Sequence, residues 1–344
     1  MRKFLKIINV VMVISFCFLI ACNSDKQNKN IMEDIKDNSE NQFVEREFKP
    51  YLNGNFIGNA ISYGPYREGQ APGQKGPSEE QIKEDLEILS SRYNLIRVYN
   101  ADDDTRLVLE TIRNYNIPMK VMLGIWLERE RDKEKSKQNK NNIEYGINLA
   151  NEYKDEVIAV SVGNEAQVYW SYHRMKIENQ FAYIDKVRES TTQPITVADD
   201  YSFWVDDTSR TLASKIDFIT THAHPAWNGL QVENSVQWLD SIYTSVAEKH
   251  PNKLQIVGET GWPTKFNKEQ IGDGQQGSLI KGEISTNAQE KFLNIYNNWV
   301  DSKKITSFLF EAFDEPWKGG GEASGENEVE KHWGIFYENR TPKF

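Results

Sequence analysis

Residues 157–165 read VIAVSVGNE, a run of β-branched and small apolar residues that ends in Gly163, Asn164 and Glu165. A continuous apolar run of this length is typical of a strand that is buried on both faces, as in a parallel sheet covered by helices. Seven further runs of the same kind occur along the chain, and each ends near polar residues or glycine. The eight predicted strands are 56–63, 95–99, 118–125, 157–163, 194–199, 216–222, 254–259 and 305–313.

Amphipathic, helix-like segments separate these runs, at 78–92, 105–115, 143–154, 175–189, 233–249 and 286–302. Strands that alternate with helices indicate a parallel α/β sheet, and eight such units fit a (β/α)8 TIM barrel, whose usual size is about 250 residues. An open, doubly wound sheet is the alternative. It requires a glycine-rich phosphate loop after its first strand, where this chain has Ser62-Tyr63-Gly64-Pro65-Tyr66. We therefore predict one barrel domain over residues 46–344.

The first 45 residues differ in composition from the rest of the chain. Three basic residues and an apolar stretch precede Leu19-Ile20-Ala21-Cys22, which resembles a bacterial lipobox. The resemblance implies that residues 1–21 are a signal peptide and that Cys22 is acylated, so that the protein is lipid-anchored outside the cytoplasm, at the cell surface or on a periplasmic membrane face. A plain secretory signal or a short membrane anchor is the alternative. The polar composition of residues 22–45 predicts a flexible tether.

Charge and cysteine usage narrow the range of partners. The chain has 51 acidic and 41 basic residues and a net charge of −10. Because an acidic surface repels phosphate polymers, nucleic acid is not expected as a partner, whereas a neutral polymer is easily accommodated. Both cysteines, Cys17 and Cys22, lie at the N-terminus, so we expect no intrachain disulfide in the mature protein. We also expect a monomer.

Two glutamates stand where predicted strands end, which in a barrel is the functional edge. Glu165 ends the fourth strand and Glu259 ends the seventh, in Gly258-Glu259-Thr260-Gly261-Trp262-Pro263. Two carboxyl groups that face each other across a barrel suit glycoside hydrolysis, in which one protonates the leaving oxygen while the other attacks the sugar or activates water. A single glutamate at such a position is more often an ordinary solvated loop residue, so the pair carries the hypothesis.

The motifs around these residues resemble glycoside hydrolase family 17, the β-1,3-glucanase family within the two-glutamate retaining barrel clan. The resemblance extends over about residues 50–340, in the family's order. Its matching segments are Ile96–Tyr99, Val162–Glu165, Gly258–Thr264, Phe313–Lys318 and Glu330–Phe336.

The resemblance implies a role for several residues. Glu165 matches the family's acid/base, Glu259 matches its nucleophile, and Asn164 matches the asparagine that hydrogen-bonds the sugar 2-hydroxyl. A polar cluster beside the acid/base is matched by Glu315, Lys318 and Glu330; a surface salt-bridge network of little energetic worth is the alternative interpretation.

The sixth strand departs from the family pattern. The family often has Tyr-Pro-Tyr there, whereas this chain has His224-Pro225-Ala226-Trp227. We expect the His224 imidazole to take the place of a tyrosine hydroxyl near the nucleophile. His222 and His224 also have the i, i+2 spacing of a metal pair, but without further ligands nearby this signal is weak. The resemblance implies no metal and no cofactor.

Aromatic residues gather near the predicted strand ends, where flat sugar faces stack on rings. Any one ring is more often part of the core than a platform. We predict substrate contacts for Tyr63 and Tyr99 and stacking platforms at Trp227 and Trp262.

The prediction from sequence is a retaining hydrolase of β-1,3-glucan such as laminarin, acting within the polysaccharide chain. A transglucosylase with the same two glutamates is an alternative, because only the acceptor side distinguishes the two. A glucan-binding lipoprotein without catalysis is the other, although such a protein has no need to keep both glutamates.

Overall fold

A computed structural model describes residues 43–272 and 275–344, and Glu45–Phe344 forms one compact unit. The predicted signal peptide, Cys22 and nearly all of the predicted tether lie outside the described residues. Within the described part, no helix combines the length and the apolar character needed to cross a membrane.

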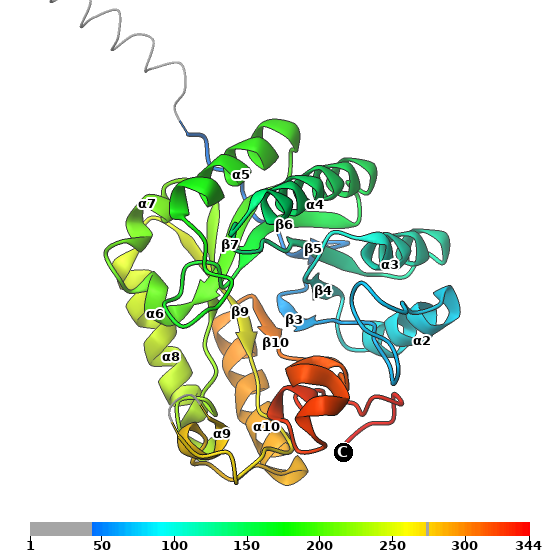
Figure 1. Cartoon of the computed structure of the whole chain (residues 1–344), viewed down its shortest axis with the longest axis vertical. Helices are drawn as coiled ribbons and strands as arrows, with labels where there is room; N and C mark the ends of the chain where they lie inside the picture. The colour runs from blue at the N-terminus through cyan, green and yellow to red at the C-terminus, as the bar shows by residue number, and fades with distance from the viewer. Residues whose placement is uncertain (1–42, 273–274) are drawn as a thin grey trace, which may run out of the picture. The chain divides into compact units, whose positions relative to one another are not determined.

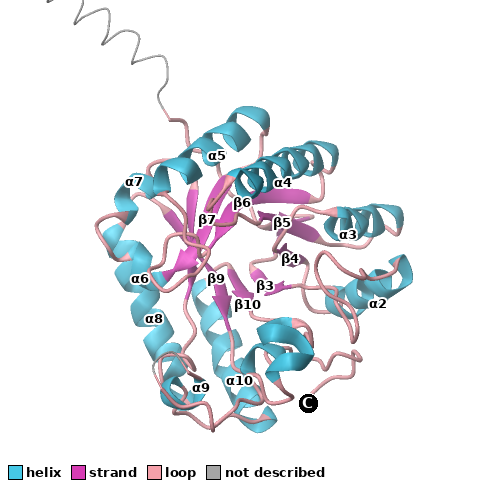
Figure 2. Ribbon diagram, in the orientation of Figure 1, coloured by secondary structure: helices cyan, strands magenta, loops and turns pink. Residues whose placement is uncertain are grey.

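Eight parallel strands close into a barrel in the order β10-β3-β4-β5-β6-β7-β8-β9, and helices surround the ring of strands (Figure 1, Figure 2). All eight correspond to predicted strands, so the (β/α)8 barrel is confirmed and the open sheet is excluded. The barrel strands are β3 Asn59–Ser62, β4 Leu95–Val98, β5 Lys120–Ile125, β6 Val157–Asn164, β7 Ile195–Asp200, β8 Phe218–His222, β9 Leu254–Thr260 and β10 Ser307–Leu309.

The six predicted helices are present, and several short elements were not predicted. The long helices are α2 Glu79–Ser90, α3 Asp103–Asn114, α4 Lys133–Glu152, α5 Ile177–Ser190, α8 Val232–Lys249 and α10 Thr286–Lys303. The additional elements are the hairpin strands β1 Tyr51–Leu52 and β2 Asn55–Phe56, the helices α6 Tyr201–Trp204, α7 Ser209–Ala213 and α9 Gln276–Leu279, and the 3-10 turns η1 Lys318–Ser324 and η2 Val329–Lys331. These pieces are too short to show a period in the sequence.

Local capping explains where helices α2 and α3 begin. Ser78 accepts a hydrogen bond from the Gln81 backbone, and the Gln81 side chain accepts one from the Ser78 backbone, which is a complete capping box. Asp102 caps α3 through the backbone of Thr105, so the carboxylate orients this helix.

Two hydrophobic clusters support the barrel. The larger one fills the space between the sheet and the helices. The smaller one contains residues from the amino ends of the strands together with Phe48, whose ring stacks on Phe218 at 4.5 Å between centroids. Its members are Phe48, Ile57, Ala60, Leu95, Met122, Ala159, Phe218, Ile256 and Phe308, and we call them the lower core. Nonpolar residues therefore fill the end of the barrel opposite the carboxyl ends of the strands.

A buried ion pair joins the last described residues to the first long helix. Arg340 donates from Nη2 and Nε to both oxygens of Asp85 on α2, at 2.6 and 2.7 Å, and Asp85 is fully buried. Tyr63 and Arg67 donate to the same carboxylate. Because β10 also pairs with β3, the beginning and the end of the barrel are held together in two places.

Candidate active site

The two predicted glutamates meet at the carboxyl ends of the strands. Glu165 directly follows β6, Glu259 lies near the end of β9, and His222 is the last residue of β8. One carboxylate oxygen of each glutamate and one ring nitrogen of His222 lie within 4.8 Å of one another. Residues separated by about 90 positions thus form one cluster because parallel strands end at the same edge.

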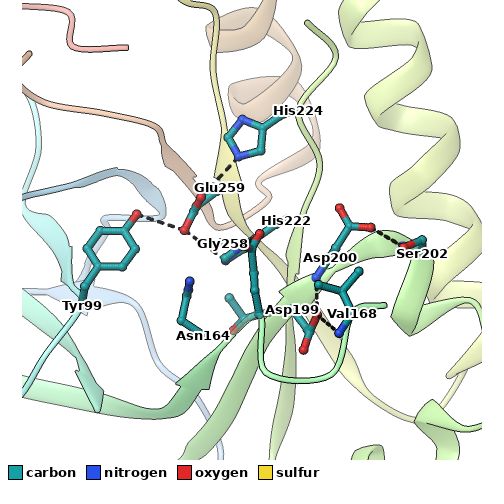
Figure 3. A network of polar contacts seen from close by, with 12 residues as sticks. Tyr99, Asn164, Val168, Asp199, Asp200, Ser202, His222, His224, Gly258 and Glu259 are labelled. Atoms are coloured by element: carbon teal, nitrogen blue, oxygen red, sulfur yellow. Dashed lines mark hydrogen bonds and ion pairs between the residues drawn. The ribbon is translucent and has the colours of Figure 1, made fainter. Parts of the chain in front are cut away.

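Glu259 is held as a carboxylate by three donors. Arg97 donates to Oε1 at 2.7 Å, Tyr99 donates its hydroxyl proton to the same oxygen at 3.0 Å, and Nε2 of His224 lies 3.3 Å from Oε2. Tyr99 and His224 approach the carboxylate from different sides (Figure 3). Burial alone would raise the pKa of Glu259, but the interactions with His222, His224 and the guanidinium of Arg97 outweigh it and hold this pKa well below its usual range.

Glu165 has the opposite electrostatic environment. Burial raises its pKa well above the usual range, and the nearby negative charge of Glu259 raises it further. Its Oε1 lies 3.0 Å from Nδ1 of His222, and a fifth of its side chain is open to solvent, at 19% exposure. Two carboxyl groups in one site therefore favour different protonation states near neutral pH.

The backbone at Glu165 is itself unusual. Its φ of +47° lies in the left-handed region, which for a residue with a side chain costs on the order of 1–3 kcal/mol. The surrounding loop is fixed by Asp199, which accepts hydrogen bonds from the backbone N–H groups of Gln167 and Val168 at 2.8 and 3.1 Å. Asp199 of β7 thus holds the turn that aims Glu165 into the site.

Arg97 connects the residues of the site, and the sequence analysis assigned it no role. Besides Glu259, it donates to Oδ1 of Asn164 at 2.5 Å and to the carbonyl of Gly258 at 3.0 Å. The arginine is 1% exposed within the otherwise apolar strand β4. A buried charge in a four-residue apolar strand is the pattern by which it could have been found, because such a charge needs partners inside the barrel.

The predicted polar cluster exists, but it does not lie against Glu165 as expected. Lys318 pairs with Glu311 at 2.5 Å and with Glu315 at 2.7 Å, and both carboxylates are buried. Its ammonium group lies 4.5 Å from the centroid of the Phe310 ring, and that ring packs edge-on against His224. The cluster therefore supports the Glu259 side of the site.

Glu330 belongs to the same side. Burial raises its pKa, while the nearby Lys318 and His224 act in the opposite direction and Glu259 adds to the increase. These buried groups are not the surface salt-bridge network considered as the alternative.

The predictions that Trp262 and Tyr63 contact the sugar are wrong. Trp262 is 1% exposed, donates its indole N–H to the Glu283 carbonyl and stacks on Phe292 of α10. Tyr63 is also 1% exposed, and its hydroxyl binds Asp85. Both rings pack in the larger core, so neither presents a face to a ligand. Trp227 is partly exposed and Tyr99 contacts Glu259, so their substrate contacts remain predictions.

Exposed aromatic residues occur instead on the loop between β6 and α5. Tyr169, Trp170 and Tyr172 are 78%, 50% and 72% exposed. Tyr169 and Tyr172 line a cavity of about 1240 Å³ together with Arg129, Arg131 and Arg174. The loop that begins at Glu165 thus lines this cavity from Gln167 onward, while neither glutamate of the site is part of the lining.

The cluster of Glu165, His222 and Glu259 is also the kind of ligand set that holds a metal ion. Arg97 already occupies it, since its guanidinium lies 2.7 Å from Glu259 and 3.0 Å from Nε2 of His222. A cation would have to displace this charge, so the arrangement fits a metal poorly. His224, the other histidine of the i, i+2 pair, contacts Oε2 of Glu259, whereas Nε2 of His222 lies near Oε1 of the same carboxylate.

A closed eight-stranded barrel with two opposed glutamates at its carboxyl edge is the architecture of the two-carboxylate glycoside hydrolases. The sequence model of the BtgE/BtgC glycoside hydrolase domain matches residues 60–334, and the chain belongs to this family. The family assignment predicted from the motifs is thereby confirmed.

Named relatives of the chain are fungal proteins. It is 27% identical over 281 residues to the glucan endo-1,3-beta-glucosidase btgC of Emericella nidulans, covering 78% of this chain and 42% of that one. The chain thus spans about two fifths of the length of the btgC proteins it matches. It is 28% identical to a glucan 1,3-beta-glucosidase of Schizosaccharomyces pombe, covering 76% of this chain and 78% of that protein.

Solved structures share the barrel. An endo-laminarinase from Formosa Hel1_33_131 superposes with a TM-score of 0.69 at 25% identity, over 84% of this chain and 86% of that one. A β-1,3-glucanosyltransferase of glycoside hydrolase family 17 from Rhizomucor miehei superposes with a TM-score of 0.65 at 23% identity, over 82% of this chain and 94% of that one. The latter similarity shows the fold alone.

Proposed function

We propose that this chain is a retaining glycoside hydrolase that cleaves β-1,3-glucan within the polysaccharide. The observation that carries the proposal is the pair of carboxyl groups in opposite environments, with oxygens within 4.8 Å of each other. Retaining enzymes place these groups about 5–5.5 Å apart, whereas inverting enzymes need about 6.5–9.5 Å to admit a water molecule. The 4.8 Å value is the limit for one oxygen of each glutamate rather than the separation of the two groups, and it agrees with the shorter, retaining spacing.

In the proposed double displacement each glutamate has its own part, in keeping with the opposite pKa shifts of the two groups. In the first step the ionised Glu259 attacks the anomeric carbon, and Glu165 transfers its proton to the departing glycosidic oxygen as that bond breaks. In the second step the ionised Glu165 takes a proton from water, the water oxygen bonds to the anomeric carbon, and Glu259 leaves as a carboxylate. We expect Asn164, whose Oδ1 accepts a hydrogen bond from Arg97, to hydrogen-bond the 2-hydroxyl of the sugar.

The substrate class and the internal cleavage both rest on the relatives. The fungal relatives are named for 1,3-β-glucan, btgC is named an endo-1,3-beta-glucosidase, and the Formosa structure is named an endo-laminarinase. The loop that begins at Glu165 carries the exposed Tyr169 and Tyr172, which we propose as further contacts for a long glucan.

A product time course on laminarin, with the full chain and with Glu259→Gln, tests the proposal. We expect mixed oligosaccharides from the earliest times, first products in the β-anomeric form by NMR, and none with the variant. Products longer than a supplied laminari-oligosaccharide would identify a transglucosylase. Glucan binding without turnover by the unaltered chain would identify the binding-only alternative.

We also propose that the chain is a lipoprotein anchored through Cys22. Support comes from the sequence alone, in which Leu19-Ile20-Ala21 precedes the cysteine at the end of an apolar stretch. Mass spectrometry of the protein expressed in a bacterium should find a diacylglyceryl group on Cys22 and release of residues 1–21. A soluble secreted form from the unaltered gene would support a plain secretory signal.

A further inference from the structure

His222 lies between the two glutamates and has no step in the mechanism above. It is fully buried at the end of β8, with Nδ1 3.0 Å from Oε1 of Glu165. On the other side of the ring, Nε2 lies 3.0 Å from Nη1 of Arg97 and 3.3 Å from Oε1 of Glu259. Figure 3 shows the ring lying beneath the Glu259 carboxylate. The imidazole is therefore the one side chain among the described residues that contacts both carboxylates.

The neighbours of His222 determine which nitrogen carries its hydrogen. Burial lowers the pKa of His222 to about 3, so the ring is neutral and has one N–H. The charged groups that face it are Glu165 from β6, Asp200 from β7, Glu259 from β9, Arg97 from β4 and His224 from its own segment. A guanidinium can only donate hydrogen bonds. Nε2 is hydrogen-bonded to Nη1 of Arg97 at 3.0 Å, whereas its 3.3 Å contact with Oε1 of Glu259 is not a hydrogen bond. Because its hydrogen-bond partner can only donate, Nε2 accepts.

This assignment places the hydrogen on Nδ1, where it is donated to Oε1 of Glu165. Within the described residues, Oε2 of Glu165 has no hydrogen-bond partner in the protein. When Glu165 is protonated, its proton consequently belongs on Oε2, the oxygen left free for a ligand. Arg97 thus fixes the tautomer of His222, and His222 fixes which oxygen of Glu165 is the acid.

We propose that His222 is a positioning residue that directs the acidic proton of Glu165 to the oxygen facing the sugar and then supports the ionised Glu165. The inference rests on the proposed function. In the first step the proton leaves Oε2 for the glycosidic oxygen, and the existing bond from Nδ1 becomes charge-assisted, which roughly doubles its strength. In the second step Glu165 takes the proton of water and the bond returns to its neutral form. His222 neither gains nor loses a proton.

Two matched substitutions separate the two sides of the ring. His222→Asn keeps an amide N–H near the position of Nδ1 and loses the Arg97 side, whereas His222→Gln reaches toward Arg97 and loses the donor to Glu165. We expect kcat/KM on laminari-oligosaccharides to fall about 10–100-fold for the glutamine variant, because hydrogen bonds to charged groups contribute about 1.5–3 kcal/mol. The asparagine variant should stay within about threefold of the unaltered protein, since the donor is kept.

Two further measurements, one with a different leaving group and one of the pH profile, distinguish a positioning role of His222 from a role in packing alone. With a dinitrophenyl glycoside, which leaves without acid assistance, glycosyl-enzyme formation in the glutamine variant should be nearly unchanged. A donated hydrogen bond favours the ionised carboxylate, so its loss raises the pKa of Glu165. The basic limb of kcat/KM should therefore move to higher pH in His222→Gln and stay in place in His222→Asn.

Equal losses in both variants on both substrates, with an unmoved basic limb, would show that the ring merely fills space. If neither variant folds, ¹⁵N NMR of the unaltered protein with labelled histidine still decides. The inference requires a protonated Nδ1 and an unprotonated Nε2 for His222, and the opposite tautomer overturns it. Turnover that persists in Glu259→Gln would instead contradict the proposed function, so the two failures are distinguishable.

Discussion

Phe308 and Met122 fill the barrel near the amino ends of β10 and β5, whereas Arg97 and Glu259 face each other near the carboxyl ends of β4 and β9. The lower core consists of apolar side chains that need no polar partner. The upper end contains buried charges and, among the described residues, buried polar atoms without a hydrogen bond, including Nε of Arg97, Nδ1 of His224 and Oε1 of Glu311. Each such atom costs about 1–3 kcal/mol when it stays unpaired.

The lower core contributes mainly to the stability of the fold, whereas the residues at the carboxyl ends of the strands contribute mainly to the proposed reaction. Apolar burial at the lower end favours the folded barrel, and part of that stabilisation offsets the unfavourable burial of charge at the upper end. Substitutions at the two ends should therefore affect different measurements. The following experiments probe that separation.

The largest effect is expected at the upper end, for Glu259→Gln. Because the variant lacks the nucleophile, kcat on laminarin should fall on the order of 10⁴-fold or more. The amide oxygen still accepts from Arg97, but this buried arginine loses its counter-charge, so the melting temperature should also fall, while the loss of kcat remains the dominant effect. Turnover assays and thermal unfolding measure the two quantities, with the exposed Glu290→Gln as the matched control. Retention of more than a hundredth of the activity would contradict the assignment.

Phe308→Ala tests the lower end. This ring is fully buried, and its removal should lower the free energy of unfolding by about 3–5 kcal/mol through lost burial and the cavity left behind. The kcat of the folded protein should be unchanged at a temperature well below unfolding. Denaturant titration checks the first expectation, with the half-exposed Phe344→Ala as control. A large fall in kcat of the folded variant would mean that the ends are coupled.

Lys318→Met should affect both measurements, since the Lys318 cluster is buried and adjoins the site. Removing the ammonium leaves Glu311 and Glu315 without their shared cation. We expect a loss of about 2–3 kcal/mol, below the usual value for a broken buried pair because Lys318 partly reaches solvent. A several-fold fall in kcat/KM should accompany it, through Phe310 and His224. Lys303→Met, which breaks the exposed pair with Asp240, should change neither quantity much.

The smallest effect is expected for Tyr99→Phe, through the pH dependence of activity. In the unaltered protein the raised pKa of Glu165 sets the basic limb, so activity is lost as pH rises through that value. The lowered pKa of Glu259 sets the acid limb. Without the tyrosine hydroxyl, ionised Glu259 loses a donor and its pKa rises, so the acid limb should move to higher pH. A pH profile of kcat/KM that shows movement of the basic limb alone would refute this account.

The fold could be predicted because the buried strands are recognisable in the sequence from their apolar and β-branched residues. In β6 and in most of the other barrel strands, adjacent apolar residues replace the alternation of a half-exposed strand, since both faces are covered. The positions of Glu165 and Glu259 followed from the same pattern, because a residue at the carboxyl end of a barrel strand faces the site. The predicted approach of His224 to the nucleophile also agrees with its 3.3 Å distance from Glu259.

The errors arose where the path of a loop decides the outcome. Trp262 follows β9 closely, yet the chain turns so that its ring packs on Phe292 rather than in the site. The Lys318 cluster lies on the Glu259 side because the segment after β10 folds against His224, which no local pattern encodes. The role of Arg97 was missed since its four partners come from residues far apart in sequence.

The pairing of β10 with β3 and the contact of Arg340 with Asp85 have a consequence for synthesis on the ribosome. The partners in these contacts are separated by more than 200 residues, so β3 and α2 leave the ribosome long before β10 and Arg340 do. Contacts of such sequence separation slow folding, because the loop must close before the contact forms. We expect the half-made barrel to expose the flank of β3 and the buried carboxylate of Asp85, and to depend on chaperones until the final segment has been translated.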